Sequence, residues 1–267
     1  MSVAEQSGAR PLAGRHAVVT GGGRGIGEAV AFELGRLGAD LTLMGRTLEV
    51  LDAVASEVRD ECAVRTHAVE VDVTDEAGVR RAFGAACETL GRAQLLVNNA
   101  GIAGSSPFKR MDLAHWRQML DVNATGTFLC TRQVVDGMLA AAWGRIVNVA
   151  SVAALRGYPY IVAYAASKHA VLGLTRSLAL ELAHTGVTVN AVCPGYTQTD
   201  MVERTVENIV SKTGRSEEEA RAELTRFNPQ GRLIEPEEVA AAVGWLCLPS
   251  SASITGQAIA VAGGEVM

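Results

Sequence analysis

The stretch His16-Ala-Val-Val-Thr-Gly-Gly-Gly-Arg-Gly-Ile-Gly27 decides the fold of this chain of 267 residues. Its apolar beginning predicts a buried strand, and the apolar residues that recur between Glu28 and Leu37 predict an amphipathic helix after the glycines. Such a strand, turn and helix bind anions well, because backbone N–H groups and the helix dipole point at the ligand. The glycine spacing is G-x-x-x-G-x-G rather than the G-x-G-x-x-G of the general dinucleotide pattern. A tight turn without a ligand is the alternative interpretation of the glycines alone.

The rest of the chain alternates between short apolar runs and helical patterns, which predicts a parallel sheet with helices on both faces. We therefore expect an α/β fold, a single-domain Rossmann-type doubly wound parallel sheet of about seven strands, over residues 1–267. Further strands are predicted at Leu41–Met44, Val64–Val71, Leu95–Val97, Arg145–Val149, Val187–Val192 and Ala258–Val261. Further helices are predicted at Leu48–Arg59, Glu76–Leu90, Thr125–Ala142, Tyr164–Ala183 and Pro236–Leu246.

One irregular region, residues 196–235, interrupts this alternation. It is charged, and it contains Pro229 and Gly231. Because it follows the carboxyl end of the sixth predicted strand, we interpret it as a helical lid over the substrate. A solvated helical insertion is the alternative.

The composition of the chain argues against several classes of partner. A net charge of −5 gives no electrostatic support to a nucleic-acid partner. The five cysteines are scattered without a C-x-x-C pair or a histidine cluster, which indicates buried thiols in a reducing compartment and no metal site. Residues 1–12 lack the apolar core of a signal peptide, and no apolar run is long enough to span a membrane. We therefore expect a cytoplasmic protein without a membrane partner.

Tyr164 and Lys168 are four residues apart in a predicted helix, so their side chains lie on one face, one turn apart. A nearby ammonium favours the phenolate and is expected to lower the tyrosine pKa from its usual value of about 10. A tyrosine tuned in this way can exchange a proton with a carbonyl or alcohol oxygen. Ser151 precedes the pair and completes a candidate acid–base trio.

These motifs together resemble the short-chain dehydrogenase/reductase family. They are, in order, TGGGRGIG at 20–27, Asp72, NNAG at 98–101, Asn123, Ser151, YAASK at 164–168 and PG at 194–195. The resemblance covers nearly the whole chain from about Leu12 onward, and it implies an oxidoreductase that transfers a hydride between a nicotinamide cofactor and a carbonyl or alcohol. A dinucleotide-sensing protein without catalysis is the remote alternative, and the presence of all four catalytic positions argues against it.

The charge at the end of the second predicted strand favours NADP(H). An acidic residue there usually reads the ribose 2′-hydroxyl of NAD, but this chain has Gly45 followed by Arg46. Arg46 and Arg24 could both bind a 2′-phosphate. The alternative for Arg46 is a surface arginine that starts the next helix.

The resemblance implies the remaining cofactor contacts. Asp72 and Val73 would flank the adenine, while Asn98 looks structural. Asp72 could instead cap a helix. Thr197 and Thr199 would hold the carboxamide. The complete expected set is Thr20, Gly21, Gly23, Arg24, Gly25, Ile26, Gly27, Arg46, Asp72, Val73, Asn99, Ala100, Gly101, Tyr164, Lys168, Pro194, Gly195, Thr197 and Thr199.

The resemblance also implies catalytic roles. Tyr164 would donate the proton, Ser151 would hold the substrate oxygen, and Lys168 would lower the tyrosine pKa and bind the nicotinamide ribose. Asn123 would bind a water that links Lys168 to solvent. Residues expected at the substrate are Ser151, Ala153, Tyr158, Tyr164 and Tyr196.

The substrate is expected to be a 3-oxoacyl thioester or a hydrophobic or cyclic ketone. The stretches 144–151, 194–201 and 228–232 look like those of 3-oxoacyl-thioester and polyketide-type ketoreductases. Ala140–Ala142 and Leu180 replace basic residues typical of members that use an acyl carrier, and Ala153 replaces a histidine typical of 3-hydroxybutyrate dehydrogenases. An NAD-dependent 3-hydroxyacyl or hydroxy-acid dehydrogenase remains the alternative. Family members usually form homotetramers through the long helices that correspond to 125–142 and 164–183.

Overall fold

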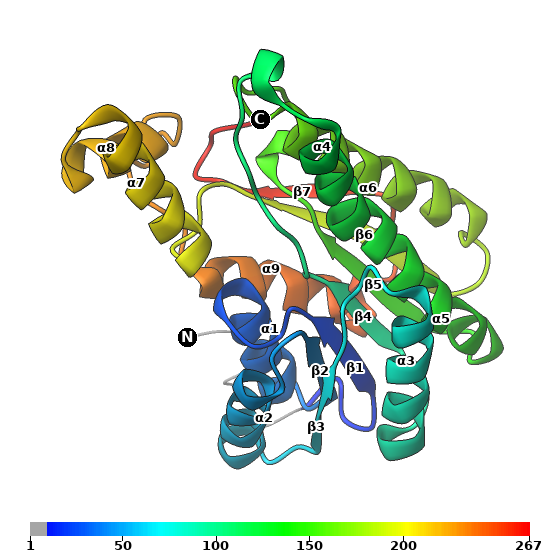
Figure 1. Ribbon diagram of the computed structural model, residues 1–267. Helices are drawn as coiled ribbons and strands as arrows, with labels where there is room; N and C mark the ends of the chain where they lie inside the picture. Colours follow the sequence, from blue (N-terminus) through cyan, green and yellow to red (C-terminus); the bar gives the residue numbers. More distant parts are fainter. Residues whose placement is uncertain (1–9) are drawn as a thin grey trace.

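The computed structural model describes residues 10–267, and a single parallel sheet of seven strands forms its centre (Figure 1). The strand order is β3-β2-β1-β4-β5-β6-β7, and every neighbouring pair is parallel. The strands are β1 (His16–Thr20), β2 (Asp40–Gly45), β3 (Thr66–Glu70), β4 (Leu95–Asn98), β5 (Gly144–Val149), β6 (Val187–Pro194) and β7 (Ala258–Val261). The predicted doubly wound fold is therefore confirmed.

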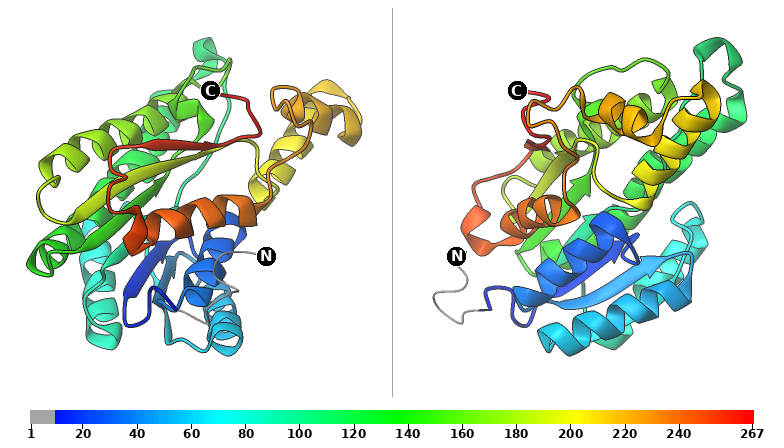
Figure 2. Two further views of the ribbon diagram at one scale, coloured as in Figure 1. Left: turned by 180° about the vertical axis from the view of Figure 1, so that it is seen from behind. Right: turned by 90° about the vertical axis from the view of Figure 1, so that its left-hand side faces the viewer.

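Two groups of helices cover the sheet. One face carries α1 (Gly25–Arg36), α2 (Leu48–Cys62) and α9 (Pro236–Cys247), and α1 packs against both of the others. The other face carries α3 (Glu76–Leu90), α4 (Leu113–Leu120), α5 (Gly126–Ala140) and α6 (Val162–Glu181). The remaining helices, α7 (Asp200–Thr213) and α8 (Glu217–Thr225), project away from these layers (Figures 1 and 2).

The central strands form because their sequences are apolar on both faces, as parallel strands covered by helices require. Every residue of β1, β4, β5 and β6 is buried. Buried side chains make one hydrophobic cluster on the α1–α2–α9 side and a second on the α3–α5–α6 side. This double-sided core holds the carboxyl ends of the strands, where the candidate site lies, in fixed relative positions.

Several boundaries differ from the predictions. Helix α1 begins at Gly25, inside the glycine motif, and α6 begins at Val162. Strand β3 is shorter than predicted, and β6 continues to Pro194. The sequence reading missed α4 and a short 3-10 turn, η2 (Phe108–Arg110). Helix α4 is capped by Asp112, whose side chain accepts a hydrogen bond from the His115 N–H.

Within the predicted lid region, residues 196–235, the structure has two helices, so the helical part of that prediction is confirmed. Both helices carry a small apolar cluster of Val202, Val206, Ala220 and Leu224. Helix α8 starts with a capping box between Ser216 and Glu219. Across residues 10–267, no helix is both long enough and apolar enough to cross a lipid bilayer.

Candidate active site

The glycine turn after β1 and the NNAG segment after β4 meet where the strand order reverses direction, the usual ligand position in such sheets. One hydroxyl organises this meeting point. Thr20 Oγ1 accepts hydrogen bonds from the backbone N–H groups of Asn99 (3.1 Å) and Ala100 (3.0 Å). In return, Asn99 Nδ2 donates to the carbonyl oxygens of Thr20 and Gly21, each at 3.1 Å. The two predicted cofactor segments are thus tied together by Thr20 and Asn99.

The glycine turn is folded so tightly that side chains are excluded from it. Gly21 and Gly25 have φ of 65° and 54°, in the left-handed region that favours glycine. A Cβ atom at Gly27 would lie 2.0 Å from the carbonyl oxygen of Gly21. Arg24 occupies the N-cap of α1 and makes no side-chain cap hydrogen bond there. The Glu28 carboxylate interacts with the Gly25 N–H, and the other N–H groups at the start of α1, together with the glycine turn, suit a pyrophosphate.

Charged residues surround this turn. Arg46 is exposed directly after β2, and its charge lowers the pKa of Asp72, although less than two hydrogen bonds from Thr74 do. Asp72 Oδ1 accepts from the Thr74 N–H at 2.9 Å and from Thr74 Oγ1 at 2.7 Å. Asp72 is therefore no helix cap. That position belongs to Asp75, which accepts from the Ala77 N–H at the start of α3.

Arg24 has a partner that sequence reasoning did not identify. Its guanidinium lies 3.5 Å from the carboxylate of Asp200, the first residue of α7. Thr199, just before it, packs so closely that a Cβ at Gly25 would lie 2.9 Å from Thr199 Cγ2. The first residues of the lid therefore touch the glycine turn.

The candidate catalytic residues Ser151 and Tyr164 lie together beyond the end of β5. Ser151 is buried and starts a 3-10 turn, η4 (Val152–Ala154), where its Oγ accepts from the Ala153 N–H at 3.1 Å. The side chains of Ser151 and Tyr164 interact, which favours the phenolate form and lowers the tyrosine pKa. Ala153 is itself buried, so it contributes its N–H more than its side chain.

Lys168 is buried below Tyr164. Its Nζ donates to the Val149 carbonyl oxygen at 2.9 Å and lies 5.9 Å from the centre of the Tyr164 ring. Burial lowers the pKa of Lys168 to about 8.

The electrostatics of Tyr164 differ from the sequence-based expectation. Burial of the phenol raises the pKa of Tyr164 above its ordinary value, and this effect outweighs the opposing influence of Ser151. The expected lowering by Lys168 is absent, because the ammonium is directed at a backbone carbonyl and carries its own burial penalty. The spacing of the pair in the helix gave their proximity correctly, but it carried no information about their burial.

Asn123 lies in a π-helical turn, η3 (Asp121–Thr125), immediately before α5. Its side-chain oxygen accepts from the Ile102 N–H at 2.8 Å, and its Nδ2 donates to the Ile102 carbonyl at 3.0 Å and to Ser167 Oγ at 2.9 Å. Both amide hydrogens are therefore used within the protein. A Cβ at Gly101 would lie 3.0 Å from Asn123 Oδ1 and 3.5 Å from Lys168 Nζ. Asn123 thus joins the segment after β4 to α6, close to Lys168.

Two predicted positions, Asn98 and Val73, and one residue that was not predicted, Cys193, are structural neighbours of this centre. Asn98 Nδ2 donates to Asn148 Oδ1 at 2.8 Å and to Thr131 Oγ1 at 3.0 Å, as expected for a residue that ties β4 to its surroundings. Val73 is buried, and its side chain fills the space beside Gly126. Cys193, a neighbour of Ser151 and Lys168, was missed, and burial raises the pKa of its thiol to about 11. That thiol stays protonated near neutral pH and is a poor nucleophile.

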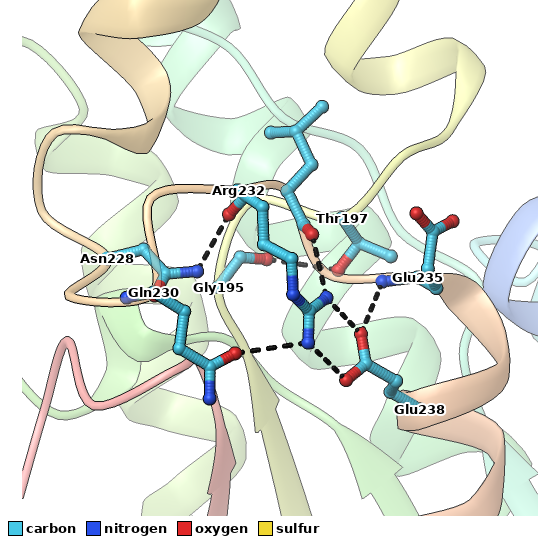
Figure 3. Close-up of polar contacts among 8 residues, drawn as sticks. Gly195, Thr197, Asn228, Gln230, Arg232, Glu235 and Glu238 are labelled. Atoms are coloured by element: carbon cyan, nitrogen blue, oxygen red, sulfur yellow. Dashed lines mark hydrogen bonds and ion pairs between the residues drawn. The ribbon is translucent and has the colours of Figure 1, made fainter.

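A polar cluster stabilises the segment that connects the lid to α9 (Figure 3). Arg232 binds both carboxylate oxygens of Glu238, at 2.6 and 2.7 Å, and Asn228 Nδ2 donates to the Arg232 carbonyl at 2.7 Å. In the segment that leads from β6 to α7, Thr197 Oγ1 donates to the Gly195 carbonyl at 3.1 Å. Thr197 also pairs with Ile234, from the segment that leads back to α9, in an isolated bridge. The predicted carboxamide residues therefore lie where the lid leaves and rejoins the sheet.

Of the predicted substrate residues, Tyr158 is partly buried and Tyr196 is 36% exposed. The charge of Tyr196 contributes to the raised pKa of Tyr164, and that of Glu265 contributes to the raised pKa of Tyr196. Tyr158 donates a hydrogen bond to Glu265 near the chain end. Glu265 was not predicted, because a loop residue so far along the chain carries no local pattern.

Known proteins with similar sequences support this reading of the geometry. Residues 15–209 match the family model described as short chain dehydrogenase. The granaticin polyketide synthase putative ketoacyl reductase 1 of Streptomyces violaceoruber is 42% identical, over 93% of this chain and 92% of that protein. The 3-oxoacyl-acyl-carrier-protein reductase FabG of Aquifex aeolicus is 39% identical, over 95% of this chain and 98% of that protein.

A solved structure agrees as well. A variant of actinorhodin polyketide ketoreductase, crystallised with NADPH, superposes with a TM-score of 0.90 at 38% identity, over 94% of this chain and 97% of that one. The motif order, the fold and these similarities lead to the same conclusion, which confirms the sequence-based expectation: the chain belongs to the short-chain dehydrogenase family.

Proposed function

We propose that this protein is an NADP(H)-dependent oxidoreductase that reduces a ketone to a secondary alcohol, or catalyses the reverse reaction. The observation that carries the proposal is the contact between the side chains of Ser151 and Tyr164, with the buried Lys168 nearby. Two hydroxyl groups side by side can hold one carbonyl oxygen and deliver a proton to it.

In this mechanism NADPH, when bound, supplies the hydride to the carbonyl carbon. Ser151 Oγ and the Tyr164 hydroxyl bind the carbonyl oxygen, on which negative charge develops. Tyr164 then gives its proton to that oxygen. Because burial raises the pKa of Tyr164, the phenol is protonated at neutral pH and is ready to act as the acid in the reductive direction. Lys168, whose pKa of about 8 keeps most of its charge at pH 7, is assigned to the nicotinamide ribose.

Asn123 is assigned as a positioning residue that keeps the segment around Gly101 and Lys168 in place. Its two amide hydrogens are already bound by Ile102 and Ser167. A water that serves as the proton link to solvent would therefore have to donate to an Asn123 oxygen rather than accept from the amide.

The residues that would hold NADP(H) fit its charge distribution. The glycine turn and the first N–H groups of α1 suit the pyrophosphate. Arg24 and Arg46 are both exposed cations at this edge and suit the 2′-phosphate. Asp72 and Val73 are assigned to the adenine, and Pro194, Gly195, Thr197 and Thr199 to the nicotinamide end. NADPH is also the nucleotide in the crystal structure of the similar actinorhodin ketoreductase variant.

The substrate class we assign is a 3-oxoacyl thioester or a hydrophobic or cyclic ketone. The named relatives act on, or are named for, ketoacyl and polyketide substrates. Tyr196 is close enough to Tyr164 for its charge to act on it, Tyr158 and Phe227 meet edge to face, and aromatic side chains of this kind suit an apolar molecule.

We also propose that the protein acts as one domain and as a homotetramer in the cytoplasm. Large apolar side chains are exposed on the two long helices, where Leu180 of α6 is 80% exposed and Phe128 of α5 is 47% exposed. Exposed apolar residues of this size on neighbouring helices are typical of an interface. A monomer at micromolar concentration by light scattering would contradict the assembly.

The proposal is tested by loss of NADPH absorbance with a panel of 3-oxoacyl thioesters, cyclic diketones and aryl ketones. We expect turnover with at least one of them and a preference for NADPH over NADH in kcat/KM. Arg46→Asp should shift that preference toward NADH by about tenfold or more, because it removes a charge-assisted contact. Arg59→Asp makes the same charge change at the other end of α2 and should leave the preference unchanged. A wild-type preference for NADH would contradict the cofactor assignment.

A further inference from the structure

Glu265 is a buried carboxylate without an ionic partner. Its residue is 8% exposed, and it takes part in none of the salt bridges among residues 10–267. Oε1 accepts a hydrogen bond from the Tyr158 hydroxyl. Within the same residues no donor reaches Oε2. Among residues 10–267, Oε2 is not one of the fully enclosed polar atoms that lack a partner, so this oxygen is accessible to solvent or to a ligand.

The second carboxylate oxygen of Glu265 lies beside a glycine that we assign to the nucleotide site. Glu265 Oε2 lies 3.3 Å from the position a Cβ would take at Gly195, the glycine at the end of β6 that we assign to the nicotinamide end. The charge of Glu265 also acts on Tyr196, and that of Tyr196 acts on Tyr164. The carboxylate is therefore within electrostatic range of side chains that border the proton donor.

Arg156 contacts Glu265 through the backbone and makes no salt bridge with its carboxylate. The Arg156 Nη1 donates to the backbone carbonyl of Glu265 at 3.3 Å, and its guanidinium stacks 4.7 Å from the Tyr158 ring and 5.5 Å from the Phe227 ring. Tyr158 and Phe227 meet edge to face, with ring centres 6.1 Å apart. Arg156, Tyr158 and Phe227 thus form an aromatic wall between the lid and the segment before α6. The Glu265 carboxylate is the acceptor beside this wall.

We propose that Glu265, oriented by Tyr158, is a specificity-determining residue that accepts a hydrogen bond from a hydroxyl group of the ketone substrate, away from the carbonyl that is reduced. This inference rests on the proposed ketone reduction. A polar group placed in an otherwise aromatic wall orients a ligand and rejects analogues that leave it unpaired. The same negative charge should repel ketones that carry a carboxylate.

Two matched sets of ketones test the proposal. One set is cyclohexanone, 4-hydroxycyclohexanone and 4-oxocyclohexanecarboxylate, and the other is 1-tetralone, 6-hydroxy-1-tetralone and its 6-carboxy analogue. In at least one set, we expect the hydroxylated ketone to exceed the unsubstituted one by about tenfold or more in kcat/KM, mainly through KM, and the carboxylate to be the poorest. Calorimetric binding of the same ketones to the protein saturated with NADP⁺ should follow the same order.

Variants assign the preference to this residue. Glu265→Leu should remove the preference and leave turnover of the unsubstituted ketone within about threefold, while Glu265→Gln, which retains an acceptor, should keep part of it. Glu88→Leu, which removes a charge from the exposed face of α3, should keep all of it. If Glu265→Leu does not fold, Glu265→Gln and the wild-type binding order still decide.

Three results overturn the proposal: equal binding and turnover within both sets, a carboxylate that is preferred, or a hydroxyl preference that survives Glu265→Leu. They are distinct from failure of the proposed function. If the enzyme reduces all the ketones indifferently, only the role of Glu265 fails. If no ketone is reduced, the proposed function fails, and the calorimetric order still tests Glu265.

Discussion

The nucleotide-binding half of the sheet and the lid are stabilised in opposite ways. In the first, from β1 to β4, buried apolar strands are covered by helices, and hydrogen bonds from Thr20 and Asn99 join the two ligand segments. In the lid, α7 and α8 share a cluster of only four buried apolar side chains. The other lid contacts include ion pairs such as Arg221–Glu203 and Arg24–Asp200, whose side chains are partly or largely exposed. Exposed ion pairs contribute little, so the lid should open locally while the nucleotide half stays folded.

The largest expected effect comes from breaking the rigid half at its tightest point. Gly27→Ala would place a Cβ 2.0 Å from the Gly21 carbonyl oxygen and 2.6 Å from Asn99 Nδ2, so the turn must shift away from α1. We expect NADPH affinity to fall by about a hundredfold or more and the midpoint of urea unfolding to fall with it. Fluorescence titration with NADPH measures the first effect.

Gly84→Ala in α3 is the matched control. A Cβ at Gly84 would meet no atom within 4 Å, so alanine should leave NADPH binding unchanged and stabilise the helix by up to about 1 kcal/mol. Equal behaviour of the two variants would mean that the glycine turn is not the rigid cradle described above.

A second, smaller effect concerns the charge buried beside the catalytic tyrosine. Burial lowers the pKa of Lys168 to about 8, so above that pH the folded protein holds a neutral lysine while the unfolded chain remains protonated up to about pH 10.5. Wild-type stability from this group therefore rises with pH between about 8 and 10.5, by up to about 1.4 kcal/mol per pH unit. Lys168→Met removes this dependence, so its stability relative to wild type should be greatest below pH 8 and decline above it.

Urea unfolding of wild type and Lys168→Met at several pH values from 7 to 10 measures this trend, and Lys212→Met, an exposed change in α7, controls for general loss of charge. A stability difference that stays constant, or that grows in favour of the variant as pH rises, would show that Lys168 is not buried as described.

The smallest expected effect is on the lid. Arg221→Gln removes a partly exposed ion pair with Glu203, which should lower global stability by less than about 1 kcal/mol. Amide exchange in α7 and α8 should nevertheless accelerate, while exchange in β1 and β6 stays unchanged. Hydrogen-exchange mass spectrometry separates these regions, and lid amides as slow as those of β1 would remove the contrast on which the comparison rests.

The same contrast explains what sequence could predict. Strand β1, the glycine turn and α1 are coded by neighbouring residues, so their arrangement followed from local pattern, apart from a shift of the helix start to Gly25. Helix α4 was missed although Asp112 provides a cap, because it has only eight residues and buries only Met119. The π-helical turn at Asn123 depends on partners at Ile102 and Ser167, which are distant in sequence.

Within the candidate site, the order of motifs indicated which residues would gather, but not their environments. The helical spacing of Tyr164 and Lys168 predicted a neighbouring cation, whereas burial is the main cause that raises the pKa of the tyrosine. The sequence did not predict Glu265 as a site residue, because its contact with Tyr158 joins segments separated by more than a hundred residues. Burial and long-range contacts are properties of the packed fold, and no local pattern encodes them.

The central claim is that the Tyr164 hydroxyl, held by Ser151 beside the nucleotide site, delivers the proton during ketone reduction. Tyr164→Phe removes that hydroxyl and keeps the ring, so the measurement is kcat and NADPH affinity of this variant beside wild type. We expect kcat to fall by at least about a hundredfold with NADPH affinity unchanged, as for loss of a general acid. Turnover close to that of wild type would contradict the account.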